Sequence, residues 1–380
     1  MLLPIVIIFF VSTYIIFSIL LQKGWRSVKE TIVPDSFTPQ TSVTIIVPVR
    51  NEENSIGDLL KGLLNQNYPE SLMKVFLVDD QSTDGSTEIL REWSMNYSSL
   101  FRYLEVSERN KTLKGKKKAI ASAIDATDST LILTTDSDCT IGKDWIRTFV
   151  YVYEQSNPVF ISGPVRMVAE KSLWGRFQEI EFASLIGSGA SAIGLGSPLM
   201  CNGANLAYTR EAYTSVHGFE GNEQIASGDD EFLMHKMTIA FPGGISFIKN
   251  KAAIVETKAA INLNEFIQQR KRWAGKWSHY TVVYVKLVAL WVFLFHFTLI
   301  AVLLLAFLNQ VHWNWIIMLW LTKGIFDYFY LKSVTNFLSN DFKNDTFIVS
   351  VLIYPFYVVT FGVLSRFGKY DWKERTERLS

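Results

Sequence analysis

Two aspartates, Asp136 and Asp138, lie one residue apart at the end of the apolar stretch "LILTTDSDCT" (131–140). Side chains alternate in direction along an extended chain, so we expect both carboxylates on the same side. Two negative charges this close repel each other unless a cation or hydrogen bonds intervene. Mg²⁺ and Mn²⁺ prefer oxygen ligands, and Mg²⁺ often combines one or two carboxylates with substrate phosphates. The pair therefore predicts a Mg²⁺ or Mn²⁺ site, although aspartates are also common in simple turns.

A second acidic group lies in "ASGDDEFLMHK" (226–236), where Asp229, Asp230 and Glu231 precede two apolar residues. A carboxylate there could act as a general base that takes a proton from an attacking hydroxyl. The alternative is a helix N-terminus, where acidic side chains stabilise the helix dipole. Together the two acidic groups suit a transfer reaction with a diphosphate leaving group, because a metal neutralises the charge that develops on it.

Strands and helices that alternate along the chain must position these acids. Short β-branched apolar runs in "SVTIIVPV", "KVFLVDD" and "TLILTTDSD" favour buried strands, with a further strand near 101–106. Helices are predicted after the first strand, near 87–97 and at "LKGKKKAIASAI". This alternation predicts a parallel α/β sheet, whose ligands bind at the carboxyl ends of the strands. The acids at those ends are Glu52, Glu53, Asp79, Asp80, Asp136 and Asp138.

No GxGxxG follows the first strand and no GxxxxGK[ST] occurs in the chain. A bound nucleotide would therefore meet acids and a divalent ion rather than a glycine-rich loop. The 37 basic and 36 acidic residues give a net charge of +1, which does not indicate a nucleic-acid partner. The two cysteines, Cys139 and Cys201, form neither a disulfide framework nor a metal motif.

Four apolar segments are candidates for crossing a membrane: 2–21, 287–308, 311–331 and 346–365. Positive charges at Lys23, Arg26 and Lys29 follow the first segment, which favours an uncleaved anchor over a signal peptide and a cytoplasmic domain after it. In the third segment, Lys323 and Asp327 share a helical face and could pair. Four crossings would place the basic tail outside, against the positive-inside rule, unless one segment is re-entrant or interfacial.

These patterns predict an N-terminal transmembrane anchor at 1–22 and a cytoplasmic α/β domain at 40–260. An amphipathic interfacial helix is expected at 261–280, because "NLNEFIQQRKRWAGKWSHY" combines apolar residues at helical spacing with basic ones. About three membrane helices follow at 281–366, and a basic tail at 367–380. The expected location is the cell (inner) membrane, as a multi-pass protein; the oligomeric state stays open.

The ordered segments "VDDQSTDGS", "TDSD", "GDDEFL" and "QRKRW" resemble the D, DxD, [ED]D and QxxRW motifs of the inverting family 2 glycosyltransferases. The resemblance is to their membrane-integrated branch, with its ceramide glucosyltransferase-like and processive synthase-like enzymes, and covers roughly residues 42–273. The segments "LKGKKKAI" and "CNGANLAYTR" also resemble the family. Two residues depart from it: Asp229 stands where Glu is usual, and Glu374 replaces the glycine of a "WKGR" ending.

The resemblance implies the GT-A nucleotide-sugar fold and a nucleoside-diphospho sugar donor, expected to be a UDP-sugar. It implies substrate contacts for Pro48, Glu52, Asp79, Asp80, Lys117, Asp136, Asn202 and Gly203. It implies catalytic roles for Asp229, Asp230, Gln269, Arg272 and Trp273, with Asp230 as the base. It implies a metal at Asp136 and Asp138, with Asp138 the more direct ligand. Lys116–Lys118 and Arg272 are candidate cations for the leaving diphosphate. The alternatives are a solvated helix face for the lysines and an interfacial anchor for Trp273.

Three functions are compatible with these features. The leading hypothesis is a membrane hexosyltransferase that glycosylates a lipid acceptor at the cytoplasmic face, because the QxxRW segment lies between the soluble domain and a membrane segment. The second is a processive polysaccharide synthase with a glycan acceptor. The small number of membrane segments argues against a polymer channel within a single subunit. The third is an inert scaffold with a relic sugar-binding domain, against which the intact acids at every motif argue.

Overall fold

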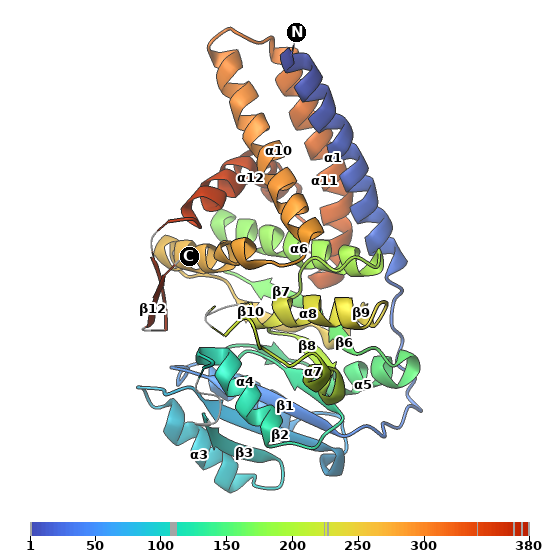
Figure 1. Ribbon diagram of the computed structural model, residues 1–380, viewed down its shortest axis with the longest axis vertical. Helices are drawn as coiled ribbons and strands as arrows, with labels where there is room; N and C mark the ends of the chain where they lie inside the picture. The colour runs from blue at the N-terminus through green and yellow to red at the C-terminus, as the bar shows by residue number, and fades with distance from the viewer. Residues whose placement is uncertain are drawn as a thin grey trace. The chain divides into compact units, whose positions relative to one another are not determined.

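The computed structural model describes residues 2–106, 112–223, 225, 228–339, 341–367, 369–373 and 375–378 (Figure 1). Its chain divides into two compact units. Unit 1 comprises Met1–Arg26, Ala169–Ser191 and Ala259–Ser380, and unit 2 comprises Ser27–Val168 and Ala192–Lys258. The expected domain at 40–260 is thus interrupted, because helix α6 (Leu173–Gly194) packs its Phe177 with Phe266 and Phe361 of unit 1.

Unit 2 is built on a seven-stranded sheet in the order β3-β2-β1-β4-β8-β6-β9. Its strands are β1 (Val43–Val49), β2 (Met73–Asp79), β3 (Phe101–Glu105), β4 (Leu131–Thr134), β6 (Phe160–Ser162), β8 (Leu206–Thr209) and β9 (Ile245–Phe247). Strands β1 to β4 are mutually parallel where they pair, and so are β6 and β9. Only β8 runs antiparallel to its neighbours β4 and β6. The predicted α/β domain with a mostly parallel sheet is confirmed.

Helices α2, α3 and α4 follow the strands as the sequence predicted, whereas α5 and α7 were not predicted; α4 and α8 pack on one face of the sheet against Ile46, Phe76 and Ile132. They are α2 (Ile56–Leu64), α3 (Ser86–Asn96), α4 (Gly115–Asp125), α5 (Trp145–Ser156), α7 (Arg210–Ser215) and α8 (Asp229–Ala240). A smaller sheet joins β5 (Thr140–Ile141), β10 (Val255–Lys258) and β7 (Val165–Val168). The short helical turns are η1 (Glu70–Leu72) and η3 (Lys251–Ala253).

Strand β1 lies between β2 and β4, with Val49 opposite Asp79 and Ile46 opposite Thr134. All three strands are buried along almost their whole length, which explains their near-continuous apolar sequences. Because they are parallel, the loops after β1, β2 and β4 leave the sheet at the same edge. In open α/β sheets, ligands bind at this edge, next to the point where the strand order reverses.

Unit 1 is helical. It contains α1 (Leu2–Ser27), most of α6, α9 (Leu263–Ala274), the short helix η4 (Gly275–His279), α10 (Val283–Phe307), α11 (Trp313–Leu338) and α12 (Asn344–Leu364). Strands β11 (Lys369–Trp372) and β12 (Arg375–Arg378) pair antiparallel after α12. Glu374, noted for its departure from the family ending, lies outside the described residues.

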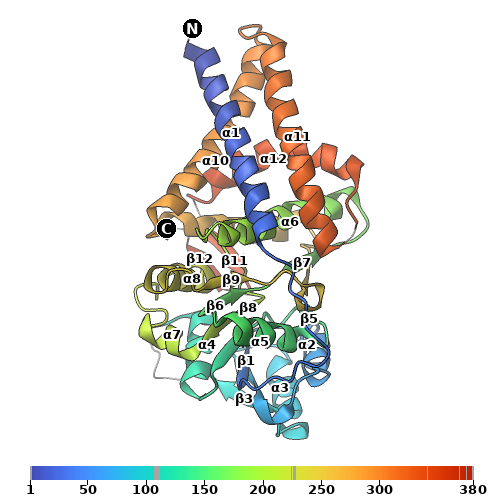
Figure 2. The ribbon, with the colours of Figure 1, turned by 90° about the vertical axis from the view of Figure 1, so that its right-hand side faces the viewer.

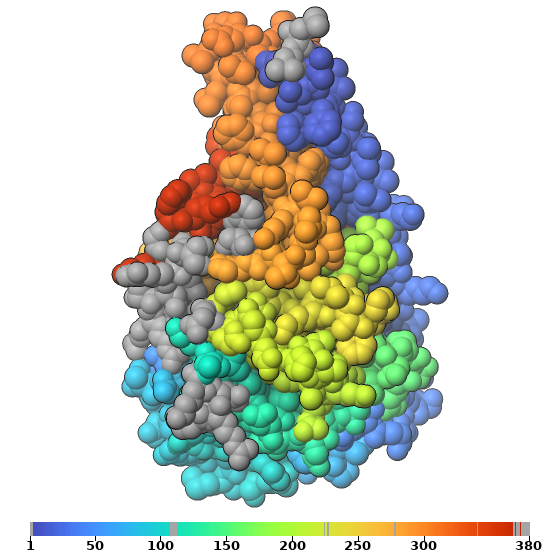
Figure 3. All heavy atoms as spheres, in the orientation of Figure 1, coloured from blue at the N-terminus to red at the C-terminus, as the bar shows by residue number. Residues whose placement is uncertain are grey.

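Three helices in the described part of the chain are long and apolar enough to cross a membrane: Leu3–Ser27, Val283–Phe307 and Asn344–Leu364. The predicted third crossing, 311–331, falls in α11, which is not one of these three. Helices α1, α10 and α11 nevertheless run beside one another (Figure 2). They share an apolar core whose buried members include Tyr14, Phe295 and Leu319. In the space-filling view, α10 (orange) packs along α1 (blue) (Figure 3).

A polar contact is buried among these apolar helices. The hydroxyl of Tyr14 in α1 donates to Asp327 in α11, and Lys323 of α11 donates to the same carboxylate. Lys323 is 2% exposed, and its ammonium also lies over the ring of Tyr354 at 5.2 Å. The expected pairing of Lys323 with Asp327 is therefore present. Ionised side chains among membrane helices are costly unless they are paired, so this contact fixes the approach of α1 to α11.

Candidate active site

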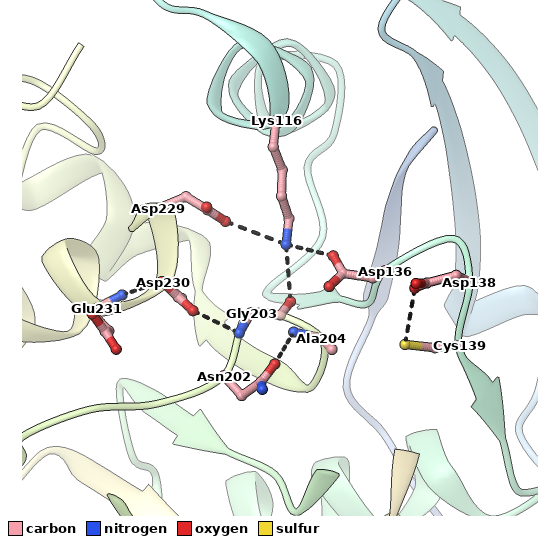
Figure 4. Close-up of polar contacts among 10 residues, drawn as sticks. All are labelled: Lys116, Asp136, Asp138, Cys139, Asn202, Gly203, Ala204, Asp229, Asp230 and Glu231. Carbon is pink, nitrogen blue, oxygen red and sulfur yellow. Dashed lines mark hydrogen bonds and ion pairs between the residues drawn. The ribbon is translucent and has the colours of Figure 1, made fainter. Parts of the chain in front are cut away.

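The ammonium group of Lys116, in the first turn of α4, is the centre of a polar cluster in unit 2 (Figure 4). Its Nζ lies 2.6 Å from Oδ1 of Asp136 and 3.5 Å from Oδ2 of Asp229, and it donates to the carbonyl of Gly203 at 3.4 Å. Burial disfavours the ammonium, but the charges of Asp136 and Asp229 outweigh burial and raise the pKa of Lys116 above its ordinary value. Lys116 therefore holds together the DxD loop, the loop before β8 and the start of α8.

The two aspartates of the DxD sequence do not lie on an extended strand. Strand β4 ends at Thr134, and the amide of Cys139 donates to the carbonyl of Asp136 at 3.2 Å, which closes a turn. Asp136 faces Lys116, whereas Asp138 accepts a hydrogen bond from the thiol of Cys139 at 3.7 Å (Figure 4). The expectation of two parallel side chains from strand alternation was wrong, because the strand stops before the acids.

Helix α8 begins at Asp229, directly after Gly228, whose φ of 80° is a left-handed conformation that favours glycine. Three acids occupy its first turn, where the helix dipole stabilises negative charge. Asp230 is 9% exposed; its Oδ2 accepts from the amide of Gly203 at 2.8 Å and its Oδ1 from the amide of Glu231 at 2.8 Å. The three acids therefore form a helix start, as the alternative interpretation expected, and the candidate base Asp230 is one of them.

The loop before β8 brings backbone rather than side chain to this cluster. A Cβ at Gly203 would lie 2.9 Å from Nζ of Lys116 and 3.3 Å from Oδ2 of Asp230, so only glycine fits without displacement. Asn202 accepts from the amide of Ala204 at 3.0 Å, which shapes this turn. Gly203 is therefore placed in the cluster, and Asn202 supports its loop.

The lysine run divides into two roles. The side chain of Lys117, 1% exposed, donates to the carbonyls of Asn222 and Ile225, each at 2.8 Å, and lies 5.4 Å from the centre of the Phe232 ring. It anchors the chain that leads into α8. The lysine that reaches the carboxylates is Lys116, whereas the family resemblance implied the substrate contact for Lys117.

The loops after β1 and β2 are tied to each other. Arg50 donates to the carbonyls of Asp80 and Gln81 at 2.8 and 2.7 Å, and the amide of Glu52 donates to Ser86 at 2.8 Å. The carboxylate of Asp79 accepts from the amide of Ser82 at 2.9 Å and the hydroxyl of Thr87 at 2.6 Å, so it shapes the loop itself.

The other residues predicted at this edge take several positions. Pro48 lies in β1, Asp80 is buried, and Glu52 accepts from the hydroxyl of Ser55. Arg50 was missed by sequence reasoning, although it directly follows a predicted strand and is the only cation at that strand end.

The QxxRW residues Gln269, Arg272 and Trp273 lie on α9, in unit 1. Trp273 packs against Phe182, with ring centres 5.8 Å apart. Arg270, the first of two residues between Gln269 and Arg272, is 1% exposed and forms an ion pair with Glu181 of α6. Sequence reasoning missed both members of this pair, because Arg270 looked like one of several basic residues on a polar helix.

Oxygen donors at the DxD turn fit a hard divalent cation. No group of three or more His, Cys, Asp or Glu side chains is arranged to hold a metal among the residues that the structure describes. Asp136 and Asp138 supply carboxylates from one turn, and Mg²⁺ or Mn²⁺ on two carboxylates completes its shell with phosphate oxygens and water. Lys116 lies against the first of these carboxylates, so an ion at Asp136 would meet a competing positive charge.

Two family models match this chain. The model for "Glycosyl transferase family 2" matches residues 44–216, which include the loops after β1, β2 and β4. The model for "Glycosyl transferase family group 2" matches residues 131–362, more than half of the chain, from the DxD strand to α12.

Curated relatives are similar over part of their length. The chain is 25% identical to a hyaluronan synthase of Streptococcus pyogenes over 264 residues, 66% of this chain and 61% of that protein. It is 28% identical to a poly-beta-1,6-N-acetyl-D-glucosamine synthase of Staphylococcus epidermidis over 148 residues, 38% of this chain and 34% of that protein. The chain thus spans between about a third and three fifths of these relatives.

A solved structure shares the fold. It is a mannosyltransferase of Pyrobaculum calidifontis in complex with GDP-Man and Mn²⁺, with a TM-score of 0.55 and 17% identity, and the match covers 96% of this chain and 94% of that one. This likeness supports the expected GT-A-like fold, and the family models confirm the expected family. The chain belongs to the family 2 glycosyltransferases.

Proposed function

We propose that this glycosyltransferase moves a sugar from a UDP-sugar to the hydroxyl of a membrane lipid, with inversion at the anomeric carbon. The observation that carries the proposal is the convergence of Asp136, Asp229 and Gly203 on Lys116, with Asp230 hydrogen-bonded to Gly203 in the same cluster. This brings the DxD turn beside the acidic start of α8, so a diphosphate at the first lies near a base on the second.

The donor is proposed to bind at the carboxyl edge of the sheet. Its nucleoside lies in the loops after β1 and β2, near Pro48, Glu52 and Asp80, which Arg50 ties together. Its diphosphate lies at Asp136 and Asp138. A bound Mg²⁺ or Mn²⁺ supplies charge neutralisation at the leaving diphosphate. Lys116 supplies a second positive charge from the protein at the same place.

The acceptor hydroxyl is proposed to lose its proton to Asp230. Its oxygen forms a bond to the anomeric carbon while the bond from that carbon to the diphosphate oxygen breaks, and the electron pair leaves with the diphosphate. A hydroxyl is a weak nucleophile at neutral pH, so a positioned base accelerates this step. The amides of Gly203 and Glu231 hold both oxygens of Asp230 in place, which fixes the direction of the carboxylate.

A lipid acceptor is supported by the elements around the QxxRW helix. Helix α9 is followed along the chain by α10, one of the three helices that could cross a membrane. Gln269, Arg272 and Trp273 are proposed to contact the acceptor or the donor diphosphate. The location proposed with this function is the inner membrane, with unit 2 in the cytoplasm.

A polysaccharide synthase is the second candidate, because two of the curated relatives carry the names of polymer synthases. The acceptor would then be the end of a growing glycan. Both candidates use the same donor chemistry at Asp136, Asp138 and Asp230, and they differ in the size of the product.

The test is a donor screen on purified protein in nanodiscs with Mn²⁺, with and without a bacterial lipid extract. UDP-glucose, UDP-N-acetylglucosamine, UDP-glucuronic acid and GDP-mannose are offered singly, and nucleotide release and product mass are measured. A single sugar added to a lipid supports the leading proposal, whereas a polymer ladder selects the second. Nucleotide release that no lipid or glycan product accompanies contradicts both.

A further inference from the structure

Arg270 is a buried cation on the QxxRW helix. It occupies a position of the motif at which no particular residue is specified. Its side chain is 1% exposed, although it lies on a helix rich in polar residues. Its surroundings are apolar: Phe177, Ala260, Phe266 and Phe361 form a core cluster between α6, α9 and α12. Burying a charge among apolar side chains costs free energy unless the charge is paired and hydrogen-bonded. The contacts of Arg270 therefore indicate its role.

The charge of Arg270 is matched by Glu181 of α6, which is bonded in turn to α12. Its Nη2 donates to Oε2 of Glu181, whose side chain is fully buried. The other oxygen of Glu181 accepts from the hydroxyl of Tyr357 in α12 at 2.7 Å. One carboxylate therefore ties the middle of α9 to two other helices of unit 1.

A second contact fixes the residues just before α9. The side-chain amide of Gln178, one turn before Glu181 on α6, donates to the carbonyl of Ala260 and accepts from its amide, each at 3.1 Å. Gln178 and Glu181 lie three residues apart, on the same face of α6. Helix α9 is thus held to α6 both before its first turn and at its centre.

The guanidinium of Arg270 in turn contacts residues of the motif. It lies 4.3 Å from the ring centre of Trp273 and 4.3 Å from that of Phe266, three residues after it and four before it on the same helical face. It also donates to the side-chain carbonyl of Gln269. Two of the three motif residues, Gln269 and Trp273, therefore touch a side chain whose direction Glu181 sets.

We propose that Arg270 and Glu181 are positioning residues of this glycosyltransferase, which hold Gln269 and Trp273 in their working orientation. A planar guanidinium can stack its face on an indole while its edge donates to two side chains, whereas a lysine ammonium has donors but no plane to stack. The rival explanation is an ion pair that only stabilises the helix packing. The two explanations differ in what happens when the charges are removed together.

The first test is the Arg270→Lys variant of the full chain in nanodiscs. It keeps the buried charge but loses the stacking plane. The environment of Trp273 is read by acrylamide quenching, as the difference between each protein and its Trp273→Phe derivative, because the chain has 11 tryptophans. We expect greater quenching of Trp273 and about a tenfold or larger fall in kcat for UDP release from a mixture of UDP-glucose and UDP-N-acetylglucosamine. Unchanged quenching and unchanged kcat would overturn the proposal.

The second test is the double variant Glu181→Met/Arg270→Met beside each single variant. A single variant leaves one buried charge without its partner and should lower the midpoint of thermal unfolding, whereas the double variant should recover it. The proposal expects Trp273 to stay exposed to acrylamide and kcat to stay low after stability has recovered. If quenching and kcat return to the parent values with stability, the pair is only structural and the proposal fails.

The matched control is Asp345→Asn. Asp345 of α12 pairs with Arg176 of α6 at 3.8 Å and is 71% exposed, so it joins at the surface the two helices that Glu181 and Tyr357 join in the interior. It should leave the unfolding midpoint, the quenching and kcat unchanged. The kinetic arm rests on the proposed UDP-sugar donor. If the parent protein releases no UDP, that donor is wrong, and the quenching arm still decides the positioning roles.

Discussion

The ammonium of Lys116 lies 2.6 Å from the carboxylate of Asp136, the first residue of the DxD turn. A divalent ion bound at this turn, as proposed, would therefore compete with the lysine for one carboxylate before any donor is bound. A diphosphate that arrives with the ion would give Lys116 a new anionic partner.

Lys116→Met should strengthen Mn²⁺ binding in the absence of donor, because Asp136 loses its competing cation. The same variant should lower the transfer rate, because a positive charge near the leaving diphosphate is gone. Calorimetric titration of Mn²⁺ and the rate of nucleotide release check the two effects. Lys74→Met, which removes an exposed pair with Asp128, should change neither. Weaker Mn²⁺ binding in Lys116→Met would contradict the competition.

Asp230→Asn should lower the transfer rate by about 10²- to 10⁴-fold, because the amide cannot take the acceptor proton. Binding of UDP and Mn²⁺ should persist, since the loops after β1 and β2 are untouched. Nucleotide release and UDP titration are the measurements. A variant that keeps most of its transfer rate would remove Asp230 from the role of base.

Chelation with EDTA should stop transfer, and added Mn²⁺ or Mg²⁺ should restore it. Asp138→Asn should raise the Mn²⁺ concentration needed for half-maximal rate, while the unfolding midpoint changes little because Asp138 is only half-buried in a turn. Activity that survives EDTA treatment would show that the DxD turn acts without a metal.

Gly203→Ala should disturb the site more than the fold. The new Cβ would meet the flexible end of Lys116 at 2.9 Å, so the ammonium is displaced from Asp136 at little cost in stability. The transfer rate should fall, and the unfolding midpoint should stay near that of the parent. Gly57→Ala in α2 is the control, because nothing lies within 4 Å of its Cβ, and it should gain about 0.5–1 kcal/mol of helix stability.

Lys117→Met should loosen the start of α8 without touching the carboxylates. Two backbone carbonyls, of Asn222 and Ile225, lose their charged donor, a local cost of about 1–3 kcal/mol. Hydrogen exchange at residues 219–223 and in the first turn of α8 should accelerate. Lys114→Met, in an exposed position, should leave that exchange unchanged. Equal exchange in both variants would mean that Lys117 does not anchor this segment.

The first four strands of unit 2 and the helices between them were predictable because buried parallel strands are uniformly apolar and their ends carry turn residues. The antiparallel strand β8 was not, since its four residues carry no alternation that tells direction. Among the site residues, the sequence identified the acids but not the lysine that gathers them. Successive residues on a helix point about 100° apart, so the register of α4 alone decides whether Lys116 or Lys117 faces Asp136.

The same limit explains Arg270. A basic residue on an amphipathic helix is normally exposed, and only the packing of α6 and α12 around α9 shows that this one is buried. Its partner Glu181 lies 89 residues earlier in the chain, and no local pattern connects them. Contacts over such a separation come from tertiary packing and leave no periodic signal in one sequence.

The buried contact of Tyr14 with Asp327 and Lys323 makes the first helix a component of the bundle rather than a detachable tether. Removing residues 2–27 to obtain a more soluble form would strip one hydrogen-bond donor from a charged pair and uncover the apolar faces of α10 and α11. Truncated forms of this enzyme should therefore aggregate. An expression strategy that keeps the first helix and places any fusion partner ahead of it preserves the native packing.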